Sequence, residues 1–180
     1  IEQVGKKKML LFSGSSNQEL AGKVALELGT DLSEVEKTQF ANGEIYIRVQ
    51  DSVRGADCFV MQSHSGDVNF TIMEQLLLVD TLKRASAKRI TAVLPFYPYS
   101  RQDKKALPRE PISARMIADL FISAGADRIV SIDLHTQQIQ GFTDKPFDHL
   151  TAMPLFVNYF KEKQTLHDHQ KRHDKSTVHR

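Results

Sequence analysis

Apolar residues along the chain alternate between short runs, typical of strands, and a spacing of three to four residues, typical of one helix face. Strands are predicted at Met9–Phe12, Ile45–Val49, Cys58–Met61, Ile90–Leu94 and Ile129–Ile132. Helices are predicted over Leu20–Leu28, over Ile72–Leu82, from Pro111 in the first turn to a stop at Gly125, and over Leu155–Phe160. Strands separated by helices favour a parallel sheet, so the sequence predicts an α/β fold with helices on both faces.

The loops that follow these strands are the expected place for a binding site. Parallel α/β sheets bind their ligands beyond the carboxyl ends of the strands. Three such loops cover residues 13–17, 95–110 and 133–148. Candidate chemistry is therefore sought first in these segments.

The loop 95–110, PFYPYSRQDKKALPRE, combines aromatic rings with a cluster of positive charges. The positive side chains are Arg101, Lys104, Lys105 and Arg109. Arg and Lys recognise phosphate groups, Arg through a planar fork of donors and Lys as a point charge. The loop is thus a candidate polyphosphate site whose aromatic rings could face a base, although a solvated connecting loop fits the same pattern.

A carboxylate and an imidazole follow the last predicted strand. Because strand residues alternate between faces, Asp133 and His135 are expected to point the same way at the carboxyl edge of the sheet. The pair could bind a divalent ion or a phosphate, with Asp144 and Asp148 adding oxygen ligands. A hydrogen-bonded histidine at a strand end is the structural alternative.

For two turn-like segments, a structural role is favoured over ligand binding. FANGE at 40–44 contains the Asn-Gly pair of a tight turn, and an ordinary turn is favoured there. SGSSN at 13–17 precedes a helix start, where backbone N–H groups can hold a phosphate. It lacks the Lys of a P-loop, so helix capping by Ser15, Ser16 or Asn17 is favoured.

Composition narrows the classes of protein. With 180 residues, 41% apolar and 26% charged, the chain can form one domain with its own core and is too apolar to be mainly disordered. Its 24 basic and 22 acidic residues leave a net charge of +2, which is too balanced to indicate nucleic-acid binding. No apolar run reaches the roughly 18 residues of a membrane span.

Cysteine usage and the start of the chain favour the cytoplasm. The one cysteine, Cys58, excludes an internal disulfide and indicates a reducing compartment. It lies in an apolar run and is predicted to be a core residue rather than a nucleophile. Ile1–Lys8 lacks the apolar stretch of a signal peptide.

The last residues, 165–180, read TLHDHQKRHDKSTVHR and contain four of the seven histidines. Apolar residues are nearly absent, so a charged tail that joins no core is predicted. Interleaved histidines such as His167, His169 and His173 can also bind transition metals, which is the less favoured reading.

Six motifs follow one another along the chain. They are FSGSS at 12–16, FANGE at 40–44, SVRG at 52–55, RQDKK at 101–105, PISA at 111–114 and DLHTQQIQGF at 133–142. Together they resemble the ribose-phosphate diphosphokinases, also called phosphoribosyl pyrophosphate synthetases, almost continuously from Met9 to Pro154. Of these motifs, RQDKK and DLHTQQIQGF are specific to that family.

The resemblance implies an activity and a fold. The activity is transfer of the β,γ-diphosphate of ATP to O1 of ribose 5-phosphate, which gives phosphoribosyl pyrophosphate and AMP. The family uses Mg²⁺, is often activated by a phosphate ion, and consists of two phosphoribosyltransferase-like α/β domains assembled into oligomers. Such a transfer depends on positioning and on positive charge rather than on covalent catalysis.

Roles are implied for the positions that match the family's motifs. The residues implied to bind ATP are Arg101, Gln102, Asp103 and His135, with His135 catalytic. Those implied to bind Mg²⁺ are Asp133, His135, Asp144 and Asp148. Those implied to reach the adenine of a neighbouring subunit, in place of a plain turn, are Phe40, Asn42, Gly43 and Glu44. Those implied to bind the regulatory phosphate are Ser52, Arg54, Ser86 and Arg109.

The sequence also departs from the family's pattern. Thr143 stands where Phe is usual, which affects local packing, and the resemblance stops near Lys163. A phosphoribosyltransferase-like domain over 1–163 and a disordered tail over 164–180 are therefore predicted. The family's second domain, with its catalytic Lys and Arg and its D-D-x-x-D-T-G-type loop for ribose 5-phosphate, is expected to be missing from this chain, since no such loop occurs in these 180 residues. The chain is expected to be the nucleotide and Mg²⁺ half of the enzyme; the alternative is a non-catalytic partner that binds the full-length enzyme.

Overall fold

The computed structural model describes residues 8–177, with side chains placed up to residue 165. The chain divides into two compact units, one ending at Leu150 and the other beginning at Thr151. The boundary therefore falls before residue 163, where the sequence resemblance to the family was expected to end. Each unit is described below by itself.

A parallel sheet of five strands forms the centre of the first unit, in the order β1-β4-β5-β6-β7. The strands are β1 (Met9–Ser13), β4 (Asp57–Met61), β5 (Arg89–Leu94), β6 (Arg128–Ile132) and β7 (Phe147–Leu150). The predicted α/β fold with a parallel sheet is confirmed, and four of these five strands lie where the apolar runs placed them. The sequence pattern missed β7, a short strand in which Phe147 and Leu150 flank two polar residues.

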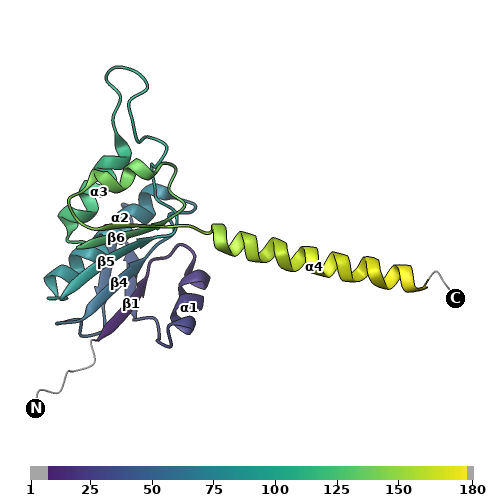
Figure 1. The fold of residues 1–180 in the computed structure, drawn as a ribbon. Coiled ribbons are helices and arrows are strands. Elements are labelled where there is room, and N and C mark those ends of the chain that lie inside the picture. The colour runs from purple at the N-terminus through teal and green to yellow at the C-terminus, as the bar shows by residue number, and fades with distance from the viewer. Residues whose placement is uncertain (1–7, 178–180) are drawn as a thin grey trace, which may run out of the picture. The chain divides into compact units, whose positions relative to one another are not determined.

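Helices cover both faces of this sheet, as predicted (Figure 1). In β1, Leu11 packs with Ala21 of α1 (Gln18–Glu27). The next residue, Phe12, packs into the larger core with residues of α2 (Val68–Arg84) and α3 (Ser113–Ala124). Successive side chains of a strand point to opposite faces, so one short apolar run serves both layers.

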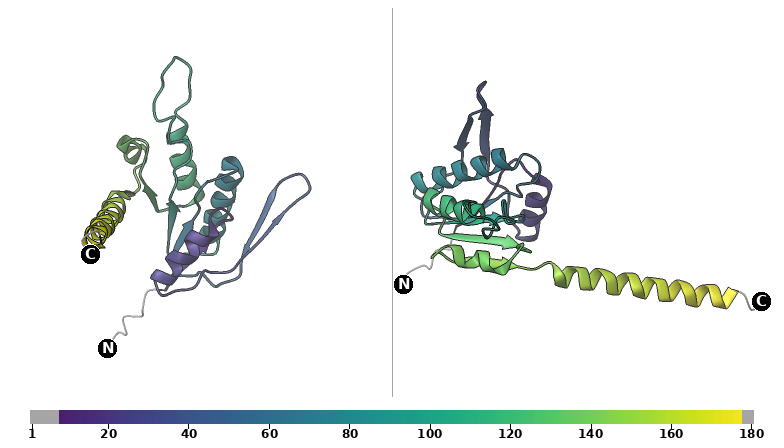
Figure 2. Two further views of the ribbon diagram at one scale, coloured as in Figure 1. Left: turned by 90° about the vertical axis from the view of Figure 1, so that its right-hand side faces the viewer. Right: turned by 90° about the horizontal axis from the view of Figure 1, so that it is seen from above.

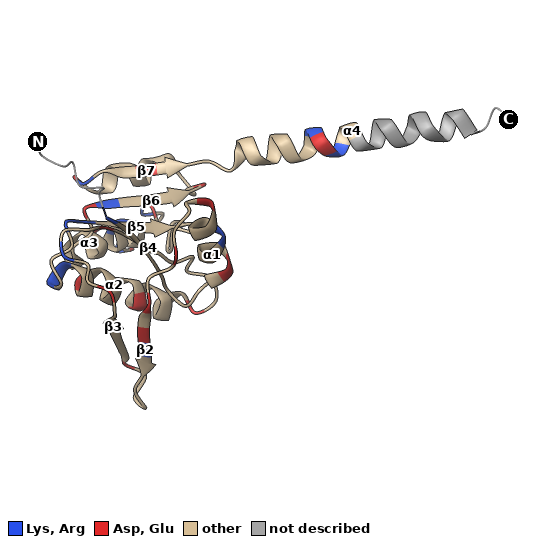
Figure 3. Cartoon of the chain, turned by 90° about the horizontal axis from the view of Figure 1, so that it is seen from below, with Lys and Arg blue, Asp and Glu red and all other residues tan. Residues whose placement is uncertain are grey.

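A separate antiparallel hairpin of β2 (Val35–Gln39) and β3 (Ile45–Val49) joins β1 and α1 to β4. Figures 2 and 3 show the hairpin running past α2 and projecting from the sheet. The strand predicted at Ile45–Val49 is confirmed, but it does not belong to the parallel sheet. The sequence VEKTQ of β2 carries one apolar residue, which is why no strand was predicted there.

The ends of the helices follow local side-chain chemistry. Asn17 caps α1, since its side-chain oxygen accepts from the Leu20 N–H at 3.3 Å. Gly125 ends α3 with φ of +125°, a region that only glycine enters readily. The prediction for Pro111 is corrected: α3 begins at Ser113, and Pro111 lies two residues before it, outside the helix.

The second unit contains one helix, α4 (Met153–Thr177). The helix predicted at Leu155–Phe160 is confirmed and is longer than expected, since it continues through most of the segment for which disorder was predicted. The histidines of residues 166–180 lie outside the described side chains, so their metal-binding reading stays a prediction. No helix in the described part of the chain is long and apolar enough to cross a membrane.

Candidate functional site

A buried carboxylate joins the two loops that carry most of the candidate chemistry. Asp103, in the loop after β5, is only 5% exposed. Its Oδ2 accepts a hydrogen bond from Thr136 Oγ1 at 2.6 Å and another from Gln138 Nε2 at 2.6 Å, both from the segment after β6. Arg101 is thereby held near the segment that contains His135, as expected for loops leaving neighbouring parallel strands.

These contacts fix the charge state of Asp103. The hydrogen bond from Thr136 is the largest cause that holds the pKa of Asp103 below its usual range. Burial acts against it, and the bond from Gln138 and the nearby His135 add smaller contributions in the same direction as Thr136. Asp103 was expected to contact ATP. The hydrogen bonds that the structure describes for its side chain connect the two loops.

The same loop is anchored to the start of α3. The Gln102 carbonyl accepts from the Ala114 N–H at 3.1 Å, and the Gln102 side chain accepts from the Ser113 hydroxyl. Buried Tyr97 donates its hydroxyl to the Ala114 carbonyl at 2.8 Å. The segment from Tyr97 to Asp103 is therefore tied to two elements, which keeps the exposed side chain of Arg101 on a fixed base.

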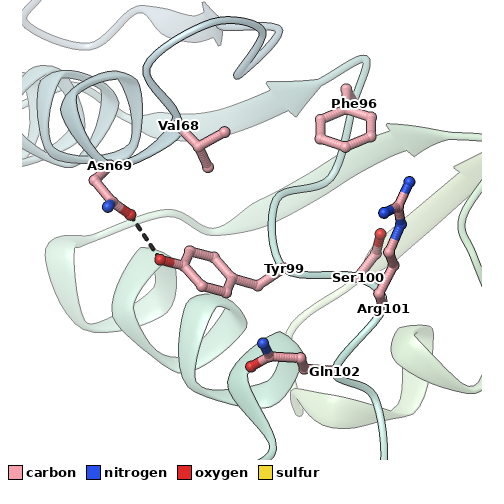
Figure 4. A pocket seen from close by; sticks show the side chains of 7 residues that line it. All are labelled: Val68, Asn69, Phe96, Tyr99, Ser100, Arg101 and Gln102. Carbon is pink, nitrogen blue, oxygen red and sulfur yellow. Dashed lines mark hydrogen bonds between the residues drawn. The ribbon is translucent and has the colours of Figure 1, made fainter.

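A hollow of about 420 Å³ lies against this loop. Its walls are Val68, Asn69, Phe96, Tyr99, Ser100, Arg101 and Gln102. Figure 4 shows the Tyr99 hydroxyl directed at Asn69 Oδ1, at 2.6 Å, while Arg101 and Gln102 extend in different directions. The hollow thus combines aromatic surface with a cation, which suits a ligand that has both an aromatic ring and negative charge.

The turn after β6 is built differently from the prediction. Asp133 has φ of +46°, so the strand ends at Ile132 and the expected alternation of faces between Asp133 and His135 does not apply. The Asp133 N–H donates to the Leu150 carbonyl at 2.9 Å, and the Leu134 N–H donates to His149 Nε2 at 3.0 Å. His149, which the sequence reading missed, therefore supports the turn that presents the exposed Asp133 and His135.

The four residues expected to bind Mg²⁺ are not brought together. Asp144 lies in the loop that enters β7, beside the amino ends of the strands, where the neighbouring Pro146 accepts from the Ile129 N–H. Asp148 forms an ion pair with Arg128, the first residue of β6. Among the described residues, no three His, Cys, Asp or Glu side chains are grouped so that they could hold a metal ion.

The residues expected to bind a regulatory phosphate are also divided. The Gly55 N–H donates to the Ser86 carbonyl at 3.0 Å, which brings the turn containing Ser52 and Arg54 next to Ser86, before the start of β5. Arg109 lies in the loop that follows β5, with φ of +70°. Within one copy of the chain, opposite ends of β5 separate Arg109 from the other three.

The segment 40–44 forms the tip of the β2–β3 hairpin. The Phe40 N–H donates to the Glu44 carbonyl at 2.8 Å, and Gly43 adopts φ of +91°, as the Asn-Gly turn chemistry predicts. With Ile45 and the α2 residues Phe70, Met73 and Leu77, the tip lines a hollow of about 560 Å³. This hollow is distinct from the one at Arg101, although both reach the first turn of α2.

The N–H groups of Ser15 and Ser16, in the segment 13–17, already donate to side chains of the protein. The Ser15 N–H and hydroxyl donate to the carboxylate of Glu74, the hydroxyl at 2.7 Å. The Ser16 N–H donates to Gln62 Oε1 at 2.9 Å. The favoured capping reading holds for Asn17 alone, and the two serines have another role.

Cys58 is a core residue, as predicted. Its side chain, on β4, is 1% exposed and packs in the main core of the domain. Burial, with a smaller contribution from neighbouring Asp57, raises the pKa of the Cys58 thiol to about 11. A thiol in this state is not a nucleophile at neutral pH.

These features define an α/β domain whose candidate site gathers cationic and aromatic side chains on loops at the carboxyl edge of a parallel sheet. Residues 9–125 match the sequence profile of the N-terminal domain of ribose phosphate pyrophosphokinase. The chain therefore belongs to the ribose-phosphate pyrophosphokinase family, which confirms the resemblance seen in the motifs.

Known relatives agree with this assignment. The chain is 60% identical over 161 residues to the ribose-phosphate pyrophosphokinase of Corynebacterium glutamicum, covering 89% of this chain and 50% of that protein. It is 57% identical over 156 residues to that of Mycobacterium leprae. The crystal structure of phosphoribosylpyrophosphate synthetase from Mycobacterium smegmatis superimposes with a TM-score of 0.85 at 58% identity, over 87% of this chain and 52% of that one. The chain thus spans about half the length of the relatives it matches.

Proposed function

We propose that this chain supplies the ATP- and Mg²⁺-binding half of a ribose-phosphate pyrophosphokinase, which transfers diphosphate from ATP to ribose 5-phosphate. The observation that carries the proposal is the bridge at Asp103, which ties the loop of Arg101 to the segment of His135. A nucleotide bound against one loop would therefore lie close to the cations of the other loop, at the same edge of the sheet.

The side chains suit a polyphosphate. Arg101 offers paired donors to phosphate oxygens, and Gln102 and the aromatic rings of Phe96 and Tyr99 offer surface to the nucleoside. His135, in the segment that Asp103 ties to this loop, would stabilise the negative charge that develops as the diphosphate is transferred. Transfer of this kind depends mainly on orientation and on such charge stabilisation.

Asp133 and His135 are the residues proposed to hold Mg²⁺. The ion binds proteins through one or two carboxylates and takes its remaining ligands from substrate phosphates and water, and the exposed carboxylate of Asp133 would supply one such ligand. When bound, Mg²⁺ supplies charge neutralisation between the phosphate groups. Asp133 would orient the ion, and the His149 bond to the Leu134 N–H would keep that turn in place.

The Phe40–Glu44 tip is proposed to contact the adenine of a nucleotide held by a second copy of the chain. This tip and Arg101 line two different hollows, so one nucleotide that meets both is best explained by two copies. The same reasoning applies to the regulatory phosphate: a second copy would have to supply Arg109 to a site formed by Ser52, Arg54 and Ser86. A homo-oligomer in the cytoplasm is the assembly that this proposal expects.

Titration of ATP with Mg²⁺ into the full chain tests the proposal. We expect saturable binding that falls at least about tenfold in both Arg101→Ala and His135→Ala, because each removes a charge-assisted contact to phosphate. Arg84→Ala is the matched control, since Arg84 pairs with Asp80 on the exposed side of α2. Binding that neither substitution changes would contradict the proposal.

An assay for AMP on the same samples tests whether this chain alone catalyses the complete reaction. Without the residues that the relatives carry in their other half, we expect no AMP from ATP and ribose 5-phosphate. Turnover by the chain alone would mean that it also holds the acceptor sugar. Absent nucleotide binding together with stable association to a full-length relative would favour the non-catalytic partner instead.

A further inference from the structure

A buried carboxylate on α2 connects four elements of the domain. Glu74 is 1% exposed. It accepts hydrogen bonds from the backbone N–H and the hydroxyl of Ser15, which follows β1, and from Gln62 Nε2, which follows β4. Its Oε1 also lies 3.2 Å from Nζ of Lys37, in the middle of β2.

The carboxylate occupies the place that a bound anion would take in the Ser15 turn. A turn that precedes a helix offers its N–H groups to negative charge, and here an internal side chain supplies that charge. Burial opposes ionisation, but the two bonds from Ser15 and the Lys37 ammonium outweigh it and hold the pKa of Glu74 below its usual range. The turn at Ser15, which we call the serine turn, thus binds the carboxylate of Glu74.

Lys37 is the group that extends this network to the hairpin. Its Nζ is buried and has no hydrogen-bond partner among the described residues, so the ion pair with Glu74 is what compensates its charge. Other polar side-chain contacts of the hairpin, such as Arg48 with Glu36, stay inside it. The ion pair is therefore a polar connection between the hairpin and the body of the domain.

The connection lies between the base of the hairpin and its tip. Val35 and Val49 at the base, and Ile47 opposite Lys37, pack against the main core, whereas the tip projects past α2 (Figure 3). Lys37 lies between them, three residues before Phe40. Ile45 and Phe70 separate the ion pair from the hollow at the tip, since both line it as well as the smaller hollow beside Lys37.

We propose that Glu74 is a positioning residue for the Phe40–Glu44 loop, which it holds in place through Lys37. The inference rests on the proposed function only in that the loop is taken to contact a nucleotide. The serine turn, Glu74 and Lys37 then form one support that sets where the hairpin tip meets its ligand.

Hydrogen exchange of the full chain tests the support directly. In Lys37→Met, which keeps the length of the side chain but removes its charge, we expect amides of β2, β3 and the 40–44 loop to exchange about tenfold faster. Amides of β4 and β5 should be unchanged, and Lys37→Arg should restore slow exchange. Lys23→Met is the matched control, because Lys23 forms an exposed ion pair with Glu19.

Nucleotide affinity on the same variants distinguishes positioning from mere stabilisation. We expect Lys37→Met to weaken binding of ATP with Mg²⁺ several-fold, and Lys37→Arg and Lys23→Met to leave it unchanged. Unchanged exchange in Lys37→Met would overturn the inference, as would a looser hairpin with unchanged affinity. If the unsubstituted chain binds no nucleotide, the proposed function fails, and exchange alone then decides whether Glu74 and Lys37 hold the hairpin.

Discussion

One buried histidine makes the stability of the folded chain depend on pH. His64, in the loop after β4, is fully buried, with Nε2 at 2.8 Å from Gln75 Oε1 and Nδ1 at 3.2 Å from Thr71 Oγ1. Gln75 donates its own amide to the Val60 carbonyl, which turns Oε1 toward the ring and leaves the imidazole hydrogen on Nε2. Burial lowers the pKa of His64 from 6.5 to about 4, and the Gln75 bond and the Glu74 charge oppose it only in part.

The direction and size of the pH effect follow from that shift. Between the two pKa values the unfolded chain binds a proton that the folded chain does not, so stability decreases as the pH falls. One pKa unit is worth about 1.36 kcal/mol, so the full window from 6.5 to about 4 is worth about 3 kcal/mol. By about pH 5.5 the expected loss is about 1.4 kcal/mol, before most carboxylates begin to titrate.

Urea unfolding at about pH 7.5 and about pH 5.5 measures the effect. The unsubstituted chain should lose more free energy of unfolding between these conditions than His64→Gln, by about 1.4 kcal/mol. The variant is expected to be less stable at both, so the comparison uses the difference between pH values rather than the absolute stability. An equal loss in both proteins would refute the reasoning, because the slope would then belong to other groups.

Three further substitutions test other parts of the structure. Gly14→Ala places a Cβ within 2.3 Å of the buried Gln62 side chain and should lower the free energy of unfolding by about 1–3 kcal/mol. Its control is Gly22→Ala, which has open space around it and should not destabilise α1. Chemical denaturation measures the free energy of unfolding of both variants. Tyr97→Phe removes the hydroxyl bond to α3 and should cost about 1 kcal/mol by the same method. Asp103→Ala disconnects the two loops and should weaken binding of ATP with Mg²⁺ in calorimetric titration; unchanged affinity would mean that the bridge does not position Arg101.

The sequence predicted the features that depend on residues close together in the chain. It missed those that depend on how distant segments are placed in the fold. The strands at Cys58–Met61 and Ile90–Leu94 were evident because buried parallel strands are continuously apolar. Asp144 follows Asp133 closely in sequence and was expected beside it. The chain instead crosses from one edge of the sheet to the other before β7 begins, since parallel strands all start at the same edge.

The role of Glu74 was hidden for a related reason. Its partner Ser15 is 59 residues away, and a glutamate within an otherwise amphipathic helix is usually read as a solvated position. The serine turn carried a visible signal, because SGSS before a helix suggests an acceptor for its N–H groups. What the sequence could not show is that the acceptor comes from the protein itself.

Internal hydrogen bonds hold several carboxylates of the domain in fixed positions. Several carboxylates are occupied by internal donors: Asp103 by Thr136, Glu74 by Ser15, and Glu110 by the N–H groups of the loop at Ala106 and Leu107. Each of these bonds holds a loop in place and lowers the pKa of the carboxyl group that accepts it.

In the part of the chain that the structure describes, neither Arg101 nor Lys104 forms an ion pair, and the residues between them, Gln102 and Asp103, are anchored by hydrogen bonds. Arg101 and Lys104 are both exposed and line one hollow of about 300 Å³ with Gln102 and Glu110. A polyphosphate is attracted by cations that no nearby carboxylate already neutralises, and it gains most where those cations are held in place. Asp103, which was expected to bind ATP, is thus proposed to contribute by holding the loop of Arg101 in place.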